Sequence, residues 1–175
     1  MHRWTAARSG RVADQEAEFV AFYAATWPRL FRTVYGVAGD RQLTEDALQT
    51  AFAQAWSRWP KVSASDDRLA YLRRMAINAA LARHRKASSR RESSVPVVPD
   101  APAPDDDWLE WDATWQAVRA LPPRQRAVVV LRYYEGLSER EIAEMLGCRP
   151  GTVKSQASAA LARLRTVLET EGTRR

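Results

Sequence analysis

The sequence predicts an all-α fold of two small helical domains joined by a linker. Apolar residues recur at three- and four-residue steps in both halves of the chain, which is the period of an amphipathic helix. No segment shows the alternation expected of a strand, and the stretch at 88–108 is rich in Ser, Pro and acids. We therefore expect a flexible tail at 1–15, a first domain at 16–87, a linker at 88–108 and a second domain at 109–170.

Composition excludes several classes of protein. The 175 residues include one cysteine, Cys148, and two distant histidines, so neither a Cys-pair metal site nor a metal or cofactor is expected. No apolar run approaches the ~20 residues that span a bilayer, and the N-terminus lacks an apolar signal core. We expect a cytoplasmic protein with no membrane insertion.

Charge is distributed in blocks along the chain. Residues 71–91 hold seven basic and no acidic residues, and residues 92–112 hold seven acidic and no basic ones. Residues 113–175 hold eleven basic and six acidic residues. Two basic blocks around an acidic connector favour two polyanion-facing units, although solubilising faces would give the same blocks.

Three helices are predicted in the N-terminal half. The first runs through a buried face from Phe19 to Tyr35, with a kink or break at Pro28, and ends at Gly39 and Asp40. The second, over 43–59, has Thr44 as its expected N-cap and Pro60 as its stop; a polar loop and a third helix at 68–86 follow. The inward positions are predicted to be Phe19, Phe22, Tyr23, Trp27, Leu30, Phe31, Val34, Tyr35, Leu48, Phe52, Ala55, Trp56, Trp59, Leu69, Leu72, Ala76, Ala79 and Ala80.

The C-terminal half is also predicted to be helical. Trp108, Trp111, Trp115, Val118 and Leu121 lie on one helix that ends at Pro122. Pro123 opens the next helix and Gly136 closes it; its Val run could form a strand, but the helical neighbours favour a helix.

A helix-turn-helix pattern follows. Ser138 and Glu141 form a capping box, which places a helix start at Ser138. Ala143, Gly147 and Val153 have the spacing in which a small residue permits close crossing, a left-handed residue makes the turn and an apolar residue anchors the second helix. Ile142, Leu146, Leu161 and Leu164 are expected to complete the core, although an ordinary helical hairpin could show the same pattern by chance.

The second helix of this motif would present its N-terminal residues to a DNA major groove. Val153, Ala157, Ala160 and Leu164 are predicted to pack inward, which leaves a small polar face for base edges. That face consists of Thr152, Lys154, Ser155, Gln156, Ser158 and Ala159. Phosphate contacts are expected from Arg124, Arg126, Arg149 and Arg163.

With these features in order, the chain resembles a bacterial sigma factor of the extracytoplasmic-function type, most closely the actinobacterial-type subgroup. "LPPRQRAVVVLRYYEGLSEREIAEMLGCRPGTVKSQASAALARLR" is similar to the sigma-four domain, which contacts the −35 element, and is the most specific element. "WPRLFRTVYGVAGDRQLTEDALQTAFAQAWSRW" is similar to the helices that dock on core RNA polymerase, and "AYLRRMAINAALARHRK" to the promoter-melting helix.

The resemblance implies partners and further site residues. The partners are promoter DNA, core RNA polymerase through its β′ clamp coiled coil and β flap, and an anti-sigma factor. Contacts to core polymerase are implied at Asp46, Gln49, Thr50 and Ala53. Contacts to the −10 region are implied at Tyr71, Arg73, Arg74 and Asn78, with the cations Arg83, Arg85 and Lys86 beside them. The linker's acidic tract would occupy a channel meant for nucleic acid.

Two other function classes are alternatives to a sigma factor. A dimeric helix-turn-helix regulator that binds operator DNA would share the C-terminal half, but it would use its N-terminal half for a ligand or for self-association. An enzyme is disfavoured because Glu45 and Asp46 point about 100° apart on a helix and no catalytic triad or ligand cluster is present.

Overall fold

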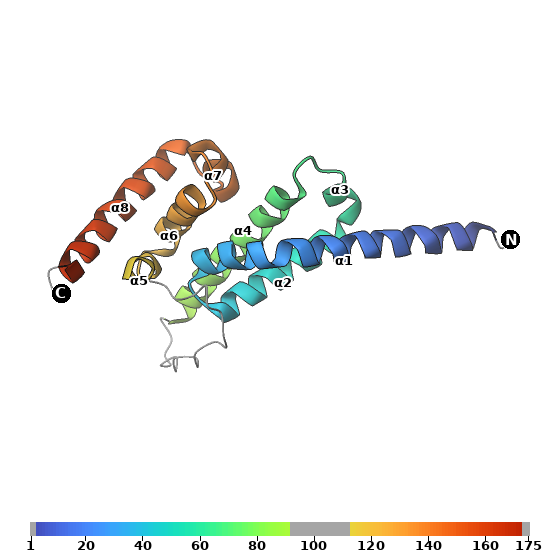
Figure 1. Ribbon diagram of the computed structural model, residues 1–175, viewed down its shortest axis with the longest axis horizontal. Coiled ribbons are helices and arrows are strands. Elements are labelled where there is room, and N and C mark those ends of the chain that lie inside the picture. Colours follow the sequence, from blue (N-terminus) through green and yellow to red (C-terminus); the bar gives the residue numbers. More distant parts are fainter. Residues whose placement is uncertain (1–2, 92–112, 173–175) are drawn as a thin grey trace.

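The structure is a computed structural model that describes the backbone of residues 3–91 and 113–172 and the side chains of residues 13–84 and 114–169. Its described elements are all helical, which confirms the predicted fold class. They form an N-terminal unit of helices α1 to α4 and a C-terminal unit of helices α5 to α8, which lie side by side in Figure 1. The predicted linker at 88–108 falls outside the described residues except at 88–91, which continue α4.

The N-terminal unit contains α1 (Arg3–Ala38), α2 (Arg41–Ser57), α3 (Trp59–Ser63) and α4 (Arg68–Arg91). Its core is formed where α1, α2 and α4 pack together, around the fully buried Leu30, Val34 and Leu48. Phe19 on α1 contacts Phe52 and Trp59 edge to face, with ring centroids 6.3 and 5.1 Å apart. These aromatic contacts join α1 to both α2 and α3.

Two residues predicted to be core lie at its edge. Tyr23 is 38% exposed and Trp56 is 42% exposed. Each still packs one ring face inward, Tyr23 on Phe52 at 4.6 Å and Trp56 on Phe19 at 5.0 Å between centroids. A large ring at the margin of a helical stripe covers the core without being enclosed by it.

Helix α1 differs from the prediction at both its start and its middle. It begins at Arg3, so residues 3–15 are helical where a loose tail was expected. It also continues through Pro28, so of the kink or break expected there, the break is contradicted. The proline side chain is exposed, while Trp27 and Phe31 on either side pack into the aromatic core. Tertiary packing on both sides holds the helix together at the position where proline removes a hydrogen bond.

The N-cap of α2 is Asp40 instead of the predicted Thr44. The Asp40 carboxylate accepts the backbone N–H of Leu43 at 2.7 Å. Thr44 is buried in the first turn, where its hydroxyl donates to the Asp40 carbonyl at 2.7 Å. Gly39 precedes the cap with φ of 69°, as expected of the residue that ends α1. Asp40 lies next to that glycine and so reaches the first free N–H groups of α2.

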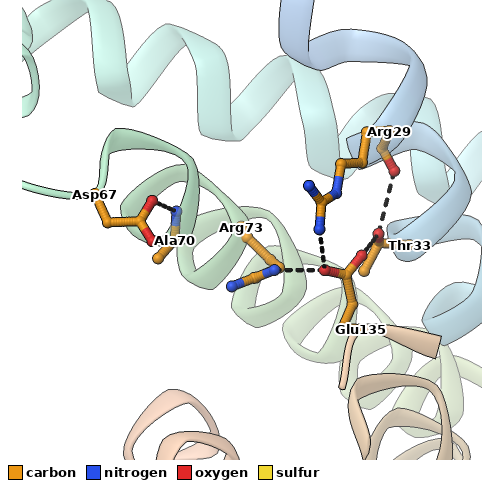
Figure 2. A network of polar contacts seen from close by, with 6 residues as sticks. All are labelled: Arg29, Thr33, Asp67, Ala70, Arg73 and Glu135. Atoms are coloured by element: carbon orange, nitrogen blue, oxygen red, sulfur yellow. Dashed lines mark hydrogen bonds and ion pairs between the residues drawn. The ribbon is translucent and has the colours of Figure 1, made fainter. Parts of the chain in front are cut away.

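The two later helices of the N-terminal unit also shift from their predicted bounds. Helix α2 ends at Ser57, and Pro60 stands in the first turn of the short helix α3, where its missing N–H costs nothing. Helix α4 begins after Asp67, whose carboxylate accepts the backbone N–H of Ala70 at 2.8 Å (Figure 2). It extends to Arg91, beyond the predicted end at residue 86.

The C-terminal unit contains α5 (Ala113–Arg119), α6 (Pro123–Val129), η2 (Val130–Tyr134), α7 (Glu139–Leu146) and α8 (Pro150–Gly172). Trp108 and Trp111, expected on the first of these helices, lie outside the described residues. The Val run is helical as predicted, but it passes into one π-helical turn at η2. Gly136 ends this segment with φ of 69°.

The capping box at the start of α7 is confirmed. The backbone N–H of Glu141 donates to the Ser138 hydroxyl oxygen at 3.3 Å, and the Ser138 backbone N–H donates to the Glu141 carboxylate at 2.8 Å. The Ser138 hydroxyl also donates to the Glu141 carboxylate at 2.6 Å, and this hydrogen bond, followed by the one from the Ser138 backbone N–H, holds the pKa of Glu141 below its usual value. Because that pKa is lower in the folded state than in the unfolded state, the carboxylate contributes to the stability of the fold. This contribution is complete above the pKa of the unfolded state and is lost as the pH falls through the pKa of the folded state.

Removing this cap is expected to destabilise the C-terminal unit. Ser138→Ala should lower the free energy of unfolding by about 1 kcal/mol at neutral pH, because the first turn of α7 loses its side-chain acceptor. Urea denaturation of both proteins at pH 7 and pH 3 would measure the effect. The difference between them should shrink at pH 3; an equal difference at both pH values would contradict a role for the Glu141 carboxylate.

Candidate nucleic-acid interface

Helices α7 and α8 form the predicted helix-turn-helix. Gly147 adopts φ of 64° and ends α7, as the turn requires. Ala143 is buried at the helix crossing and Val153 is fully buried as the anchor of α8. Ala157, Ala160 and Leu164 are buried along the same face of α8, as predicted. Leu161 was predicted to be core but is 42% exposed, because it lies about 100° around the helix from Ala160.

The opposite face of α8 is exposed and carries short polar side chains. Thr152, Lys154, Ser155, Ser158 and Ala159 are exposed and Gln156 is half-buried. The Ser155 hydroxyl donates to the Thr152 carbonyl at 2.9 Å, which occupies its proton but leaves its oxygen free to accept. Arg149 and Arg163 are exposed beside this face. The geometry therefore matches the arrangement expected of a DNA-reading helix.

Arg126, expected to contact DNA phosphates, is instead buried between the two units. Its Nε and Nη2 donate to the carbonyls of Val37 and Ala38, each at 2.8 Å, and its Nη1 donates to the Arg119 carbonyl at 2.7 Å. Burial, followed by the nearby Arg119 charge, lowers the pKa of Arg126. A guanidinium with these backbone partners is not available to DNA, so the prediction for Arg126 was wrong.

A groove of about 700 Å³ lies between α2 and α4 in the N-terminal unit. Tyr71, Arg74, Asn78 and Arg83 of α4 line it, and Thr50 lies on the α2 side. Four of the residues implied for −10 contacts therefore share one concave surface with basic and aromatic character. Arg85 and Lys86 follow on α4, but their side chains lie outside the described residues.

Arg73, also implied for −10 contacts, faces a different way. It is 8% exposed and pairs through Nη1 with the carboxylate of Glu135, which follows η2 in the C-terminal unit. Figure 2 shows Arg29 and Thr33 of α1 converging on the same carboxylate; the Arg29 Nη2 lies 3.3 Å from it and the Thr33 hydroxyl donates to it. Three side chains of the N-terminal unit thus hold one acid of the C-terminal unit.

The residues implied for polymerase contacts share one face of α2. Gln49 and Ala53 are exposed, and Asp46 and Thr50 are half-buried between that face and α4. Arg83 of α4 donates to the Asp46 carboxylate at 3.1 Å and to the Thr50 hydroxyl at 3.0 Å. Arg83 therefore lies between the groove and the α2 face, and it fixes the orientation of Asp46.

The sequence did not reveal the contacts of Arg126, Glu135 and Thr33. A weak signal existed for two of them, since Arg126 and Thr33 are polar residues on otherwise apolar helical faces. Such a residue usually finds a buried partner, but the sequence does not say which one. The sequence gives no such sign of a buried partner for Glu135, which precedes the glycine Gly136 and does not lie on an apolar helical face.

Two other kinds of feature, a metal site and a membrane span, are absent from the described ranges. No group of three His, Cys, Asp or Glu residues is placed to hold a metal ion among the residues whose positions are described. For the same residues, the helices fall short of the length and apolarity that a bilayer span needs.

Comparison with known proteins gives matches over both units. Residues 22–90 match the family model for sigma-70 region 2, and residues 111–164 match the model for sigma-70 region 4. The "RNA polymerase sigma-E factor" of Streptomyces antibioticus is 40% identical over 159 residues, which cover 87% of this chain and 86% of that protein. The "ECF RNA polymerase sigma factor SigK" of Mycobacterium bovis is 31% identical, with 91% of this chain and 90% of that protein covered.

A solved structure also shares the fold. The sigma factor RpoE of Bartonella quintana, determined in complex with the anti-sigma factor NepR, superposes with a TM-score of 0.67 at 24% identity. The superposition covers 87% of this chain and 97% of the Bartonella chain. The order of the two units, the helix-turn-helix and the similarity to actinobacterial sigma factors all support the same family. The chain belongs to the sigma-70 family as an RNA polymerase sigma factor of the extracytoplasmic-function type.

Proposed function

We propose that this sigma factor binds core RNA polymerase in the cytoplasm and directs it to promoters by reading a −35 element with α8 and a −10 element with α4. The observation that carries this assignment is the presence, in one chain, of an exposed polar face on a helix-turn-helix and a basic, aromatic groove on a separate unit. The chain supplies specificity and the polymerase supplies the chemistry, so we assign it no catalytic residue.

At the −35 element, base contacts are assigned to the N-terminal half of α8. The Gln156 amide can bond adenine bidentately, with its nitrogen donating and its oxygen accepting, Lys154 can reach guanine or a phosphate, and Ala159 can contact a thymine methyl group. Thr152, Ser155 and Ser158 supply shorter polar contacts. Arg149 and Arg163 are exposed at the margins of this face and are assigned to phosphates.

At the −10 element, the groove between α2 and α4 is assigned to an unstacked strand. Tyr71 offers a ring on which a base can stack, and Arg74 and Arg83 offer charge to the backbone. Asn78 offers an amide to a base edge. Unstacking a base costs a few kcal/mol, which such contacts offset.

Core polymerase is assigned to the exposed face of α2, with its β′ clamp coiled coil as the partner and the β flap assigned to the C-terminal unit. An arginine at position 53 would place a bulky charge in the middle of this face. We expect Ala53→Arg to weaken binding to core polymerase at least tenfold. Ala53 is small and exposed, so a partner docked on this face would lie close to it and would clash with the longer arginine side chain.

Ala24→Arg, which makes the same substitution at an exposed alanine of α1, serves as the matched control. Fluorescence anisotropy with labelled protein and purified core polymerase would compare the two variants with the wild type. Equal affinities for Ala53→Arg and Ala24→Arg would remove the assignment of this α2 face.

An anti-sigma factor stays a predicted partner. The Bartonella quintana protein of similar fold was solved with one. Co-purification from cells that express a tagged copy of this chain would show whether such a partner binds.

A further inference from the structure

The groove between α2 and α4 has polar side chains on both of its walls. The α4 wall carries Tyr71, Arg74 and Asn78, which follow one another at three- and four-residue steps and so share one face of that helix. The α2 wall carries Thr50 and Gln54, which lie one helical turn apart. Gln54 has no role in the −10 contacts proposed above, although it lines the same groove.

Three of the polar side chains in the groove already have partners within the chain. The Thr50 hydroxyl donates to the Asp46 carbonyl at 2.8 Å and accepts from Arg83 at 3.0 Å. Arg83 also donates to the Asp46 carboxylate at 3.1 Å. The Asn78 amide donates to the Met145 carbonyl at 3.2 Å. These contacts fix the orientation of the three side chains before any strand binds.

Gln54 differs from them in having its side-chain amide available. It is exposed, and within the described part of the chain its amide has no hydrogen-bond partner; the same holds for the side chains of Tyr71 and Arg74. An amide presents a donor and an acceptor side by side in one plane, whereas a phenol has a single oxygen and a guanidinium only donates. Of these three side chains, Gln54 alone can match a donor and an adjacent acceptor on a base edge.

Adenine suits such an amide better than the other bases do. Its amino group lies between two ring nitrogens, so both of its edges present a donor beside an acceptor. Guanine, cytosine and thymine present a matching pair on their Watson–Crick edge alone. A base that enters the groove can turn either edge toward α2, so adenine has two ways of pairing with Gln54 where the others have one.

The register of the two helices places Gln54 opposite the open part of the α4 wall. Arg83 meets Thr50, and α2 and α4 run in opposite directions (Figure 1). Gln54, one turn beyond Thr50, therefore faces the turns of α4 that precede Arg83. The same turns carry Tyr71 and Arg74 on the groove side. A base stacked on the tyrosine, with its backbone on the arginine, would turn its edge toward α2.

We propose that Gln54 reads an adenine of the −10 strand and is a specificity-determining residue of this sigma factor. The inference rests on the proposed assignment of the groove to −10 DNA. The Gln54 amide nitrogen donates to a ring nitrogen of adenine, and its oxygen accepts from the adenine amino group. Tyr71 stacks the base and Arg74 holds the backbone, so the two walls divide recognition between base identity and strand binding.

The test uses the complex of the full chain with core polymerase and fluorescein-labelled single strands of about twelve nucleotides. The strands are dT throughout except for one central base, which is adenine in one strand and cytosine in the other. An otherwise uniform strand can slide until this base meets the groove. We expect the wild-type complex to bind the adenine strand about tenfold more tightly than the cytosine strand in fluorescence anisotropy.

Two substitutions alter the amide with little change of shape. Gln54→Met removes both hydrogen-bonding groups and should bring the ratio of the two affinities close to one. Gln54→Glu leaves only acceptors, which suit the amino group of cytosine because a ring nitrogen flanks that group on one side only, so the ratio should reverse. Both variants keep a straight-chain residue at an exposed helix position, where the fold tolerates the change.

Gln116→Met is the matched control. Gln116 is also an exposed glutamine on a helix, but it lies on α5 in the C-terminal unit, away from the groove. Its substitution should leave the preference for the adenine strand at the wild-type value. The comparison is a ratio of two affinities within each variant, so a change in binding to core polymerase does not affect it.

The outcomes separate this inference from the proposed function. If the wild type shows no preference for adenine, or if either Gln54 variant keeps that preference, the reading role of Gln54 is refuted. If the complex binds the strands no more tightly than core polymerase alone does, the assignment of the groove fails and the inference with it. A chain that gives no promoter-specific start would contradict the proposed function, whereas loss of the adenine preference in Gln54→Met would still show that Gln54 reads a base.

Discussion

Gly39→Ala is expected to destabilise the protein by about 3 kcal/mol, about three times the effect of the same change at Gly136. Both glycines have φ of 69°, and a side chain in this left-handed region costs roughly 1 kcal/mol. A Cβ at position 39 would also stand 2.8 Å from Nη1 of Arg126, whereas at position 136 it would meet nothing within 4 Å. The difference between the variants therefore isolates the contact with Arg126.

The guanidinium of Arg126 cannot give way without losing its carbonyl partners. It is buried and bonded to Val37, Ala38 and Arg119. Hydrogen bonds from a charged group contribute roughly 1.5 to 3 kcal/mol each, so disturbing even one accounts for the extra destabilisation. Urea denaturation of both variants would measure it, and equal losses for Gly39→Ala and Gly136→Ala would contradict the anchoring role of Arg126.

Lys154→Ala and Gln156→Ala are each expected to reduce −35-dependent transcription about tenfold. A good side-chain contact to a base edge contributes roughly 1 to 3 kcal/mol of discrimination, and 1.4 kcal/mol corresponds to a factor of ten. Both side chains lie in the first turns of α8, the part of such a helix that reaches base edges. Binding to core polymerase should stay unchanged, because neither residue lies on the α2 face.

The matched control for Lys154→Ala is Arg165→Ala. Arg165 is an exposed cation on the same helix, three turns further on, and its loss changes the net charge equally. Run-off transcription on a template with and without the −35 element would compare the variants. If both Lys154→Ala and Gln156→Ala initiate like Arg165→Ala, α8 is only a bundle helix that closes the C-terminal unit.

Much of the fold follows from local patterns in the sequence. The capping box at Ser138, the left-handed turn at Gly147 and the buried stripe of α8 each depend on residues a few positions apart, and each is confirmed. The errors arise where distant contacts override a local signal. Pro28 does not break α1 because the aromatic residues beside it pack on α2, and Leu161 is exposed because one further residue rotates it out of the stripe.

The contact between the two units could not be predicted for a related reason. Arg126 lies nearly ninety residues from the carbonyls that it binds, and Arg73 is similarly remote from Glu135. The sequence predicts that α4 is basic, but a charge pattern does not say whether its cations face solvent or an internal acid. That Arg73 and Asn78 have partners in the C-terminal unit is therefore a result of the structure alone.

The central claim is that this chain gives core RNA polymerase promoter specificity. Run-off transcription with purified core polymerase on a pool of promoter fragments tests it most directly. We predict discrete starts on a subset of fragments when the chain is present and none when it is left out. Folded protein and active core polymerase that together give no promoter-specific start would contradict the account.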